Sequence, residues 1–449
     1  MISSRAVIER YWSVLDRPLD KNALAAAQIA LADGLAVMVA AVDLEPAAQP
    51  FADHATALGG TGRASIIGTG AKSSAPLAAL ANGALAHALD FEDTFEAGMI
   101  HPNASLVPAV LALAESERAE GGTVLRALAL GCDFACRLSL ALDGDPAQKG
   151  WYHPPILSGL GATLGAAVIA QLTEQQMLDA LGLFAAQFML SDELKRSPQS
   201  HLRAVREGLA ARAAVEAVLL ARHGVRALDH PLEGQSGVFH LLTGAPPRSG
   251  PMLDGLGEQL YGPAVALKRW PCCRGTHSAI MAARALRDKG VAPEAIARVE
   301  VVVTPPNDML FGPGPQASVP RTPIGAKFSI PFVFAQTIKH GTIALNSFSH
   351  SHLADPQIIA LAGRVRMASL ERDAGFDAIY EVSLASGAVH RETIAQVPIW
   401  STADVTLDDL WPKVADCFRA RGRSMSLEAY FAAIARLEQD GVEPLMALL

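Results

Sequence analysis

The feature that most constrains the fold of this chain is a succession of long apolar segments, rich in alanine and leucine, across its first 265 residues. Residues 24–42 are apolar on most faces and are interrupted by Gln28 and Asp33, a pattern typical of a buried helix and not of a membrane span. Half of the 449 residues are hydrophobic but only 6% are aromatic, which favours packed helices over a β-sandwich. We therefore expect a large helical domain.

The pattern changes near residue 266. Residues 298–304 (RVEVVVT) have the β-branched composition of a strand. Further strands are expected at 364–369, 378–385 and 389–397, the last two joined in a hairpin at Ser386-Gly387, and helical patterns return from residue 404. The chain is longer than one hydrophobic core usually supports. We predict a mostly α protein with an all-helical domain (1–265 together with 403–449) and a smaller α+β lid domain (266–402).

Charge and cysteine content restrict location and partners. The formal net charge of −8 provides no electrostatic footprint for nucleic acid. The five cysteines are odd in number and show no disulfide framework, which indicates a reducing compartment. The first 20 residues lack the pattern of a secretory signal. We expect a cytoplasmic protein without a nucleic-acid or membrane partner.

Polar side chains gather between two apolar runs near residue 90. Read as a helix through residue 93, this stretch places His87, Asp90 and Thr94 close to one face, with Asp93 beside them and His101 in the following loop. Imidazoles and carboxylates together can hold a small polar substrate and move a proton near neutral pH. The alternatives are a solvated helix face or a metal site. We expect no metal, since no HExxH, paired CxxC or EF-hand pattern is present.

Three further segments carry candidate site residues. WYHPP places His153 in a proline-rich loop that could also be a simple turn. The basic segment 193–212 contains Arg203 and Arg206, which are either a solvated face or a clamp for a carboxylate. LKRWPCCRGTH places Lys268 and His277 in a dense polar junction, where His277 either touches the substrate or caps the next helix. The glycine-rich stretch GGTGRASIIGTG matches no phosphate-binding fingerprint.

These segments together resemble one protein family. ALANGALAHALDFEDT followed by IHP, with LGGTGRASIIGTG, WYHPP, LKRWPCCRGTH and AKFSIPFVFA, is similar to the MmgE/PrpD family from about residue 25 to 400. That family includes 2-methylcitrate dehydratases, cis-aconitate decarboxylases and iminodisuccinate epimerases. The resemblance implies a helical domain with an α+β lid, a homodimer, no cofactor, and an active site in the cleft between the domains.

The resemblance also implies roles for individual residues. The catalytic positions fall on Asp90, Thr94, His101, His153 and Lys268. We expect His101 to exchange a proton with a substrate carbon, Asp90 to orient it, and His153 to place the substrate or act as a second acid or base. The substrate-binding positions fall on Asp93, Arg203, Arg206, His277 and Phe332.

Some positions differ from the decarboxylase pattern. By resemblance, Arg203 and Arg206 occupy positions where the decarboxylases carry Lys and His. Phe332 occupies the position of a Tyr, and Glu92 that of an Asp. The changes keep a cationic pocket but remove a titratable amine and a hydroxyl. Three hypotheses follow: a cofactor-independent lyase (dehydratase or decarboxylase) of a small di- or tricarboxylate, an epimerase or isomerase using the same site, or a non-catalytic carboxylate-binding protein.

Overall fold

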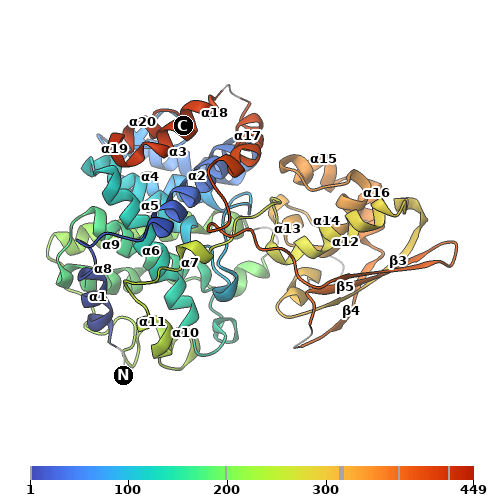
Figure 1. Ribbon diagram of the computed structural model, residues 1–449, viewed down its shortest axis with the longest axis horizontal. Helices are drawn as coiled ribbons and strands as arrows, with labels where there is room; N and C mark the ends of the chain where they lie inside the picture. The colour runs from blue at the N-terminus through green and yellow to red at the C-terminus, as the bar shows by residue number, and fades with distance from the viewer. Residues whose placement is uncertain (1–2, 198–199, 313–317, 373–374, 423–424) are drawn as a thin grey trace.

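The computed structural model describes residues 3–449 except 198–199, 313–317, 373–374 and 423–424. The chain forms two parts that are visible in Figure 1, a larger one made of helices and a smaller one that contains a β-sheet. We call them the helical lobe and the sheet lobe. The predicted mostly α fold with a small α+β part is confirmed.

The helical lobe contains the N-terminal helices. They are α1 (Ser4–Trp12), α2 (Lys21–Leu44), α3 (Gln49–Leu58), α4 (Ala75–Ala86), α5 (Pro102–Glu117), α6 (Gly121–Leu140), α7 (Pro154–Ile169), α8 (Glu174–Gln187), α9 (Leu202–Arg222), α10 (Val238–Thr243) and α11 (Ser249–Leu253). A two-stranded ribbon, β1 (Ala64–Ser65) with β2 (Lys72–Ser73), lies in the glycine-rich connector before α4. α2 is long and apolar enough to span a membrane, but 78% of its most apolar window is buried inside the protein.

Glycine contacts allow the central helices to approach closely. A Cβ atom on Gly83 of α4 would lie 2.6 Å from the Cα of Gly208 in α9, so a side chain at this crossing would collide with backbone. A Cβ on Gly161 of α7 would likewise lie 2.5 Å from the carbonyl oxygen of Gly131 in α6. The first of these crossings holds the start of α9, with its two arginines, beside the end of α4.

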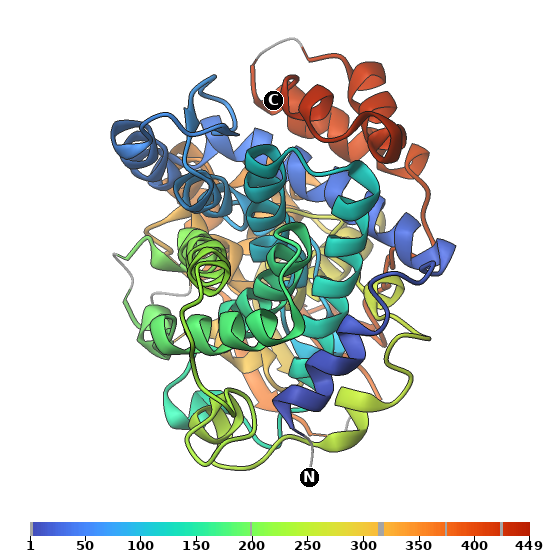
Figure 2. The same cartoon turned by 90° about the vertical axis from the view of Figure 1, so that its left-hand side faces the viewer.

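The C-terminal helices return to the helical lobe. They are α17 (Trp411–Ala420), α18 (Leu427–Ala435), α19 (Leu437–Asp440) and α20 (Glu443–Met446), drawn in red over the blue N-terminal helices in Figure 2. Lys413 of α17 joins them to α2 through an ion pair of 2.6 Å with Asp33. The Lys413 ammonium also donates to the carbonyl oxygens of Phe91 (2.7 Å) and Lys268 (3.1 Å). Through these contacts α17 holds the backbone of both segments in place.

The sheet lobe is built on four strands in the order β4-β3-β5-β6. They are β3 (Ile296–Val303), β4 (Val365–Leu370), β5 (Ala378–Leu384) and β6 (Val389–Ile394). β3 pairs in parallel with β4 and antiparallel with β5, and β5 and β6 form the predicted hairpin. The helices of this lobe are α12 (His277–Asp288), α13 (Pro323–Lys327), α14 (Ile330–His340), α15 (His350–Leu353) and α16 (Pro356–Ala362).

Each lobe has its own hydrophobic core. One cluster of buried side chains runs from Val7 to Leu267 and resumes from Val405 to Met446, with Ile324 as an outlier from the sheet lobe. The other lies between Cys272 and Val397. The exact domain boundaries at residues 266 and 402 stay a prediction.

One predicted helix is too long. The pattern of residues 78–93 indicated a helix that would carry Asp90 on the same face as His87, but α4 ends at Ala86. Asp90 has a positive φ of 51°, a left-handed conformation that stops a helix and that aspartate tolerates better than most residues. The polar cluster is therefore built on an irregular loop.

Candidate active site

The loop between α4 and α5 brings the polar cluster to the boundary between the lobes. The Thr94 N–H donates to the carbonyl of Ala266 (2.7 Å), and the Ala266 N–H donates back to Thr94 (2.8 Å). This two-residue bridge holds the loop against the segment that leads into Lys268. The Thr94 hydroxyl donates to the Ile100 carbonyl at 3.4 Å and so closes the loop on itself.

Lys268 and Asp90 form a buried ion pair across this boundary. The Lys268 Nζ lies 2.5 Å from the Asp90 Oδ1 and 3.0 Å from its carbonyl oxygen, and both side chains are at most 1% exposed. Burial on its own would lower the Lys268 pKa, but the carboxylates of Asp90 and Glu92 outweigh burial and raise it. Lys268 therefore carries a fixed positive charge and cannot serve as a base at neutral pH.

Glu92 lies between two histidines. Its Oε1 makes a short hydrogen bond with the Nδ1 of His87 and lies 3.4 Å from the Nδ1 of His101. The two imidazole rings are neighbours, with centroids 5.0 Å apart. Glu92 was not predicted as a site residue, and His87 only as a member of the polar cluster. Glu92 is the second of the three acids in LDFEDT, and this was the available signal, but sequence spacing does not show which acid faces which imidazole.

His101 has the environment of a neutral base. Its Nδ1 donates to the carbonyl oxygen of Asp93 at 2.8 Å, so its proton is on Nδ1 and its lone pair on Nε2. Burial, followed by the positive charge of Lys268, lowers the pKa of His101 well below its ordinary value. The Ser158 hydroxyl holds the His101 backbone by donating to its carbonyl at 3.1 Å.

The predicted orienting role of Asp90 is wrong in its geometry. The Asp90 carboxylate is engaged by Lys268, whereas the groups in contact with the His101 Nδ1 are the Asp93 carbonyl and Glu92. The Lys268 side chain, from a segment far along the chain, binds the Asp90 carboxylate in place of His101. That contact depends on tertiary packing and leaves no trace in the local spacing.

Two arginines at the start of α9 present hydrogen-bond donors without acceptors. The Arg206 side chain is fully buried, with its guanidinium 4.8 Å from the Tyr152 ring centroid, and it donates from Nη1 to the Arg203 carbonyl. The Arg203 guanidinium lies on the Phe328 ring, 3.5 Å from its centroid. Nε and Nη2 of both arginines are buried and have no hydrogen-bond partner in the described part of the chain.

The two arginines differ in their charge balance. Glu207 lies 3.3 Å from the Arg206 Nε, close enough for an ion pair although the angles do not form a hydrogen bond. Arg203 has no carboxylate within ion-pair distance among the described residues, and burial lowers its pKa. Unpaired buried donors destabilise the protein, and an anionic ligand that accepts from them would remove this penalty.

The two other predicted histidines lie at the edges of this cluster. His153 precedes α7, and burial lowers its pKa to about 4; the side-chain charges that act on it are those of Lys195, Asp145 and Asp192. His277 begins α12, with its ring edge-on to Trp270 at 5.0 Å. Burial, then the charges of Arg274 and Lys268, lower the His277 pKa well below its usual value. Neither histidine has a partner for Nε2 among the described residues.

Two predicted substrate contacts are wrong as stated. Phe332 is fully buried in the core of the sheet lobe, facing Phe348, and an aromatic ring enclosed by its own core cannot touch a ligand. The aromatic residue that meets Arg203 is Phe328, one helical turn earlier. The Asp93 carboxylate turns away from His101 to accept from Asn103, and it is the Asp93 backbone that faces the site.

A cavity of about 440 Å³ opens beside Arg203 between the lobes. Arg203 and Phe328 lie in its wall together with further residues of both lobes, among them Leu194, Lys195, Arg196, Ser200, Asp308, Arg321, Thr322 and Ser329. Four of the residues in its wall are basic (Lys195, Arg196, Arg203, Arg321) and one is acidic (Asp308), on a chain whose net charge is −8. Its volume and charge suit a small anion.

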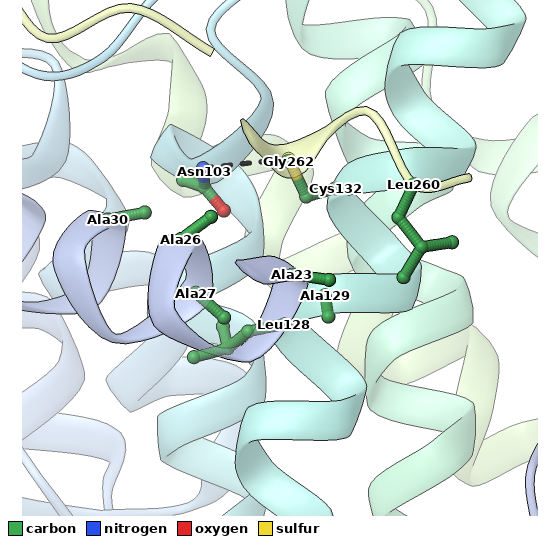
Figure 3. Close-up of a pocket in the computed structure, with 10 residues that line it drawn as sticks. All are labelled: Ala23, Ala26, Ala27, Ala30, Asn103, Leu128, Ala129, Cys132, Leu260 and Gly262. Atoms are coloured by element: carbon green, nitrogen blue, oxygen red, sulfur yellow. Dashed lines mark hydrogen bonds between the residues drawn. The ribbon is translucent and has the colours of Figure 1, made fainter. Parts of the chain in front are cut away.

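A second cavity inside the helical lobe is far smaller. Figure 3 shows alanines of α2 facing Asn103 of α5 and Cys132 of α6, around a space of about 10 Å³. Such a space holds about one water molecule. The cavity beside Arg203 is therefore the better candidate for a substrate.

The buried cluster also has the composition of a metal site. One nitrogen or oxygen of each of His87, Asp90, Glu92 and His101 lies within 4.8 Å of the others. The Lys268 ammonium, however, already neutralises Asp90 at 2.5 Å. A metal cation would meet this fixed positive charge at close range, so the electrostatics favour the ion pair over a metal.

Comparison with known proteins identifies the family. The MmgE/PrpD N-terminal domain matches residues 16–249, and the MmgE/PrpD C-terminal domain matches residues 270–396. The chain belongs to the MmgE/PrpD family. The two matched ranges follow the helical lobe and the sheet lobe, and the candidate site contains residues from both ranges.

Among curated proteins, the chain is similar to cis-aconitate decarboxylases. It is 25% identical to the enzyme of Homo sapiens over 301 residues, which is 65% of this chain and 60% of the human protein. It is also 25% identical to the enzyme of Mus musculus, over 68% of this chain and 64% of the mouse protein. The Aspergillus terreus enzyme is 25% identical over 69% and 67% of the two chains. The match thus spans less than two thirds of the human and mouse proteins.

Proposed function

We propose that this protein is a lyase that removes carbon dioxide or water from a small di- or tricarboxylate, by proton transfer at a carbon next to a carboxylate. The observation that carries the proposal is a neutral His101 close enough to feel the charge of Arg206, one of two buried guanidinium groups whose Nε and Nη2 have no hydrogen-bond partner among the described residues. The similarity to cis-aconitate decarboxylases supports a reaction of this type.

The arginines would bind the substrate carboxylates. Arg203 is held flat on Phe328 and offers Nε and Nη2, the pair of donors that matches the two oxygens of a carboxylate. Arg206 offers the same pair deeper in the protein. Because both groups are already dehydrated, a carboxylate that binds them gains charge-assisted hydrogen bonds without further desolvation of the protein.

His101 and Lys268 would carry the chemistry. Loss of a proton or of carbon dioxide beside a carboxylate leaves negative charge on the carbon and on the carboxylate oxygens. The fixed ammonium of Lys268 can stabilise this charge in a water-poor site. In a dehydration, the His101 Nε2 would take the proton from carbon and give it to the departing hydroxide, which leaves as water. In a decarboxylation, Nε2 would first bind a proton from solvent and then give it to the carbanion that loss of carbon dioxide leaves.

The test is proton NMR of the purified protein in deuterated water, with citrate, 2-methylcitrate, cis-aconitate and iminodisuccinate as candidate substrates. A lyase gives a product that has lost water or carbon dioxide. Deuterium at an α carbon with an unchanged skeleton would instead establish the epimerase alternative. Absence of any change, combined with measurable binding of the acids by calorimetry, would establish a carboxylate-binding protein and overturn the lyase proposal.

A further inference from the structure

We propose that Glu92 is the positioning residue for the proposed proton transfer: its carboxylate accepts from the Nδ1 of His87 and lies beside the Nδ1 of His101, so that both rings keep their protons on Nδ1 and present Nε2 as a proton acceptor. The inference rests on the function proposed above and adds a residue and a second imidazole to it. The sequence placed His87 in the polar cluster but gave it no role, and it did not single out Glu92 as a site residue.

The contacts around the Glu92 Oε1 carry the argument. This oxygen makes the short hydrogen bond with the His87 Nδ1 and lies 3.4 Å from the His101 Nδ1, whose main acceptor is the Asp93 carbonyl at 2.8 Å. A carboxylate and a carbonyl oxygen offer only acceptors, so the His87 Nδ1 carries its proton toward Glu92 and the His101 Nδ1 carries its proton toward the Asp93 carbonyl. In each ring the other nitrogen, Nε2, then carries the lone pair and can accept a proton.

Among the described residues, Glu92 is the hydrogen-bond partner of the His87 Nδ1, and the Asp90 Oδ1 lies farther away, at 3.9 Å. Its ring is fully buried, and its Nε2 has no hydrogen-bond partner within the described chain. The rings of His87 and His101 lie 5.0 Å apart, so the Glu92 carboxylate holds His87 directly and places its negative charge beside His101. The Glu92 Oε2 is also buried and unpartnered, which leaves Glu92 no competing contact that would draw it away.

The length of the side chain matters. The single Oε1 reaches both imidazoles from the backbone of residue 92, while the shorter acid next in the chain, Asp93, turns to Asn103 instead. An aspartate at position 92 is one methylene shorter and would reach one ring at most. Glu92→Asp therefore tests bridging, and Glu92→Gln tests charge and acceptor character at nearly unchanged size.

The first measurement is steady-state kinetics of Glu92→Gln and Glu92→Asp on the acid that the parent converts. Because Glu92 does not line the cavity, KM should change less than about threefold, while kcat should fall about 100-fold in Glu92→Gln, at the low end of general acid–base contributions. The kcat of Glu92→Asp should lie between that of the parent and that of Glu92→Gln. A rise in KM without a fall in kcat, or equal kcat in the parent and both variants, would overturn the proposal.

The matched control is Glu115→Gln. Glu115 is also a buried carboxylate of the helical lobe, but both its oxygens accept from Ser65, at 2.6 and 2.7 Å, and it touches no histidine. This variant should lose stability without a specific loss of kcat. If it loses kcat as strongly as Glu92→Gln, the effect is a general consequence of removing a buried charge and the proposal fails.

The second measurement needs no turnover. Nitrogen-15 NMR of protein labelled at its histidine rings distinguishes the Nδ1–H from the Nε2–H tautomer, with His87→Gln and His101→Gln used to assign the signals. Both rings should be Nδ1–H in the parent, and His87 should change to Nε2–H in Glu92→Gln. This result would uphold the proposal even if no tested acid is converted. Unchanged tautomers in Glu92→Gln, or an Nε2–H form in the parent, would refute it while leaving the lyase proposal open.

Discussion

The helical lobe contains two buried clusters of charge that differ in how completely they are satisfied. One surrounds Asp133 and Arg137 of α6, and the other surrounds Asp90 and Lys268 at the lobe boundary. Both contain a carboxylate paired with a cation at most 1% exposed to solvent. A buried ion pair is present in each cluster, so the ion pair alone does not explain the difference.

The cluster around Asp133 uses its hydrogen-bonding groups fully. Asp133 accepts from Tyr11 (2.6 Å), from the Arg137 Nε (2.8 Å) and from the Tyr261 N–H (2.9 Å). Arg137 then donates to three backbone carbonyls, those of Pro251, Asp254 and Gln259. Such a network has nothing left to offer a ligand and serves to hold α1, α6 and the chain after α11 together.

The cluster at the lobe boundary leaves several groups open. Unpartnered buried atoms occur on His87, Asp90, Glu92, Arg203 and Arg206. Open donors and acceptors reduce stability, and they are retained where a ligand or a proton has to be received. The comparison teaches that incomplete satisfaction, and not burial or charge, distinguishes the candidate site. Four changes test it, in order of expected effect.

The largest effect is expected for His101→Gln. This change removes the base but keeps a side chain of similar size at a position that is partly exposed, so kcat should fall about 10²- to 10⁴-fold with little change in unfolding temperature. Turnover assays and thermal unfolding monitored by circular dichroism measure the two quantities. Normal turnover in this variant would break the assignment of the boundary cluster as the active site.

Arg137→Met should have the opposite profile. It leaves Asp133 buried without its cation, which typically costs about 3–5 kcal/mol of unfolding free energy. Chemical denaturation measures that loss. The kinetic constants of the folded fraction should match those of the parent, because none of its contacts reaches the cavity. A specific loss of kcat at full stability would show that the two clusters are not functionally separate.

Arg203→Gln should weaken substrate binding without weakening the fold. Loss of a charge-assisted contact of about 1.5–3 kcal/mol corresponds to a rise in KM of about 10- to 100-fold. Stability should be unchanged or higher, since Nε and Nη2 of Arg203 have no hydrogen-bond partner among the residues that the structure describes. Arg212→Gln on the same helix, whose exposed side chain pairs with Glu216, is the control and should leave KM unchanged.

Asp93→Asn should produce the smallest effect, confined to stability at higher pH. Burial raises the pKa of Asp93 to about 7, so its folded form keeps a proton that the unfolded chain releases near pH 4. The stability linked to this group is present below pH 4 and is lost as pH rises toward 7. The unfolding free energy of the variant, relative to that of the parent, should therefore be about 1–2 kcal/mol higher at pH 7 than at pH 5. Turnover should persist, because the Asp93 carbonyl remains to hold His101. An equal stability difference at both pH values would contradict a buried, protonated carboxyl.

Much of the fold could be predicted from periodicity. The hairpin expected at Ser386-Gly387 joins β5 (Ala378–Leu384) to β6 (Val389–Ile394), and the strand expected at 298–304 forms β3 (Ile296–Val303). These elements bury one apolar side over several turns or residues, and that pattern is recorded locally. The helix expected through Asp93 failed, because contacts with Lys268 and Ala266, more than 170 positions later, bind the loop in an irregular form.

The candidate site was predicted in its residue types but not in its pairings. Asp90, His101, Lys268 and Arg206 do converge at the lobe boundary. Phe332 was assigned from a motif, whereas core packing decided that Phe328 and not Phe332 meets Arg203. Phe328 follows the end of α13, whereas Phe332 lies in α14, which begins at Ile330, so helical spacing does not relate the positions of the two rings.

By itself, the sequence determined that this chain is mostly helical, that a smaller α+β part follows residue 266, and which family it resembles. These properties depend on hydrophobic periodicity and on motifs, both of which are local. Only the tertiary structure decided that Lys268 takes the Asp90 carboxylate, that Glu92 lies between two imidazoles, and that the Arg203 donors stay open. The physical reason is that hydrogen bonds form between whichever groups the packed helices bring within about 3 Å, and that distance is set by contacts between residues far apart in the chain.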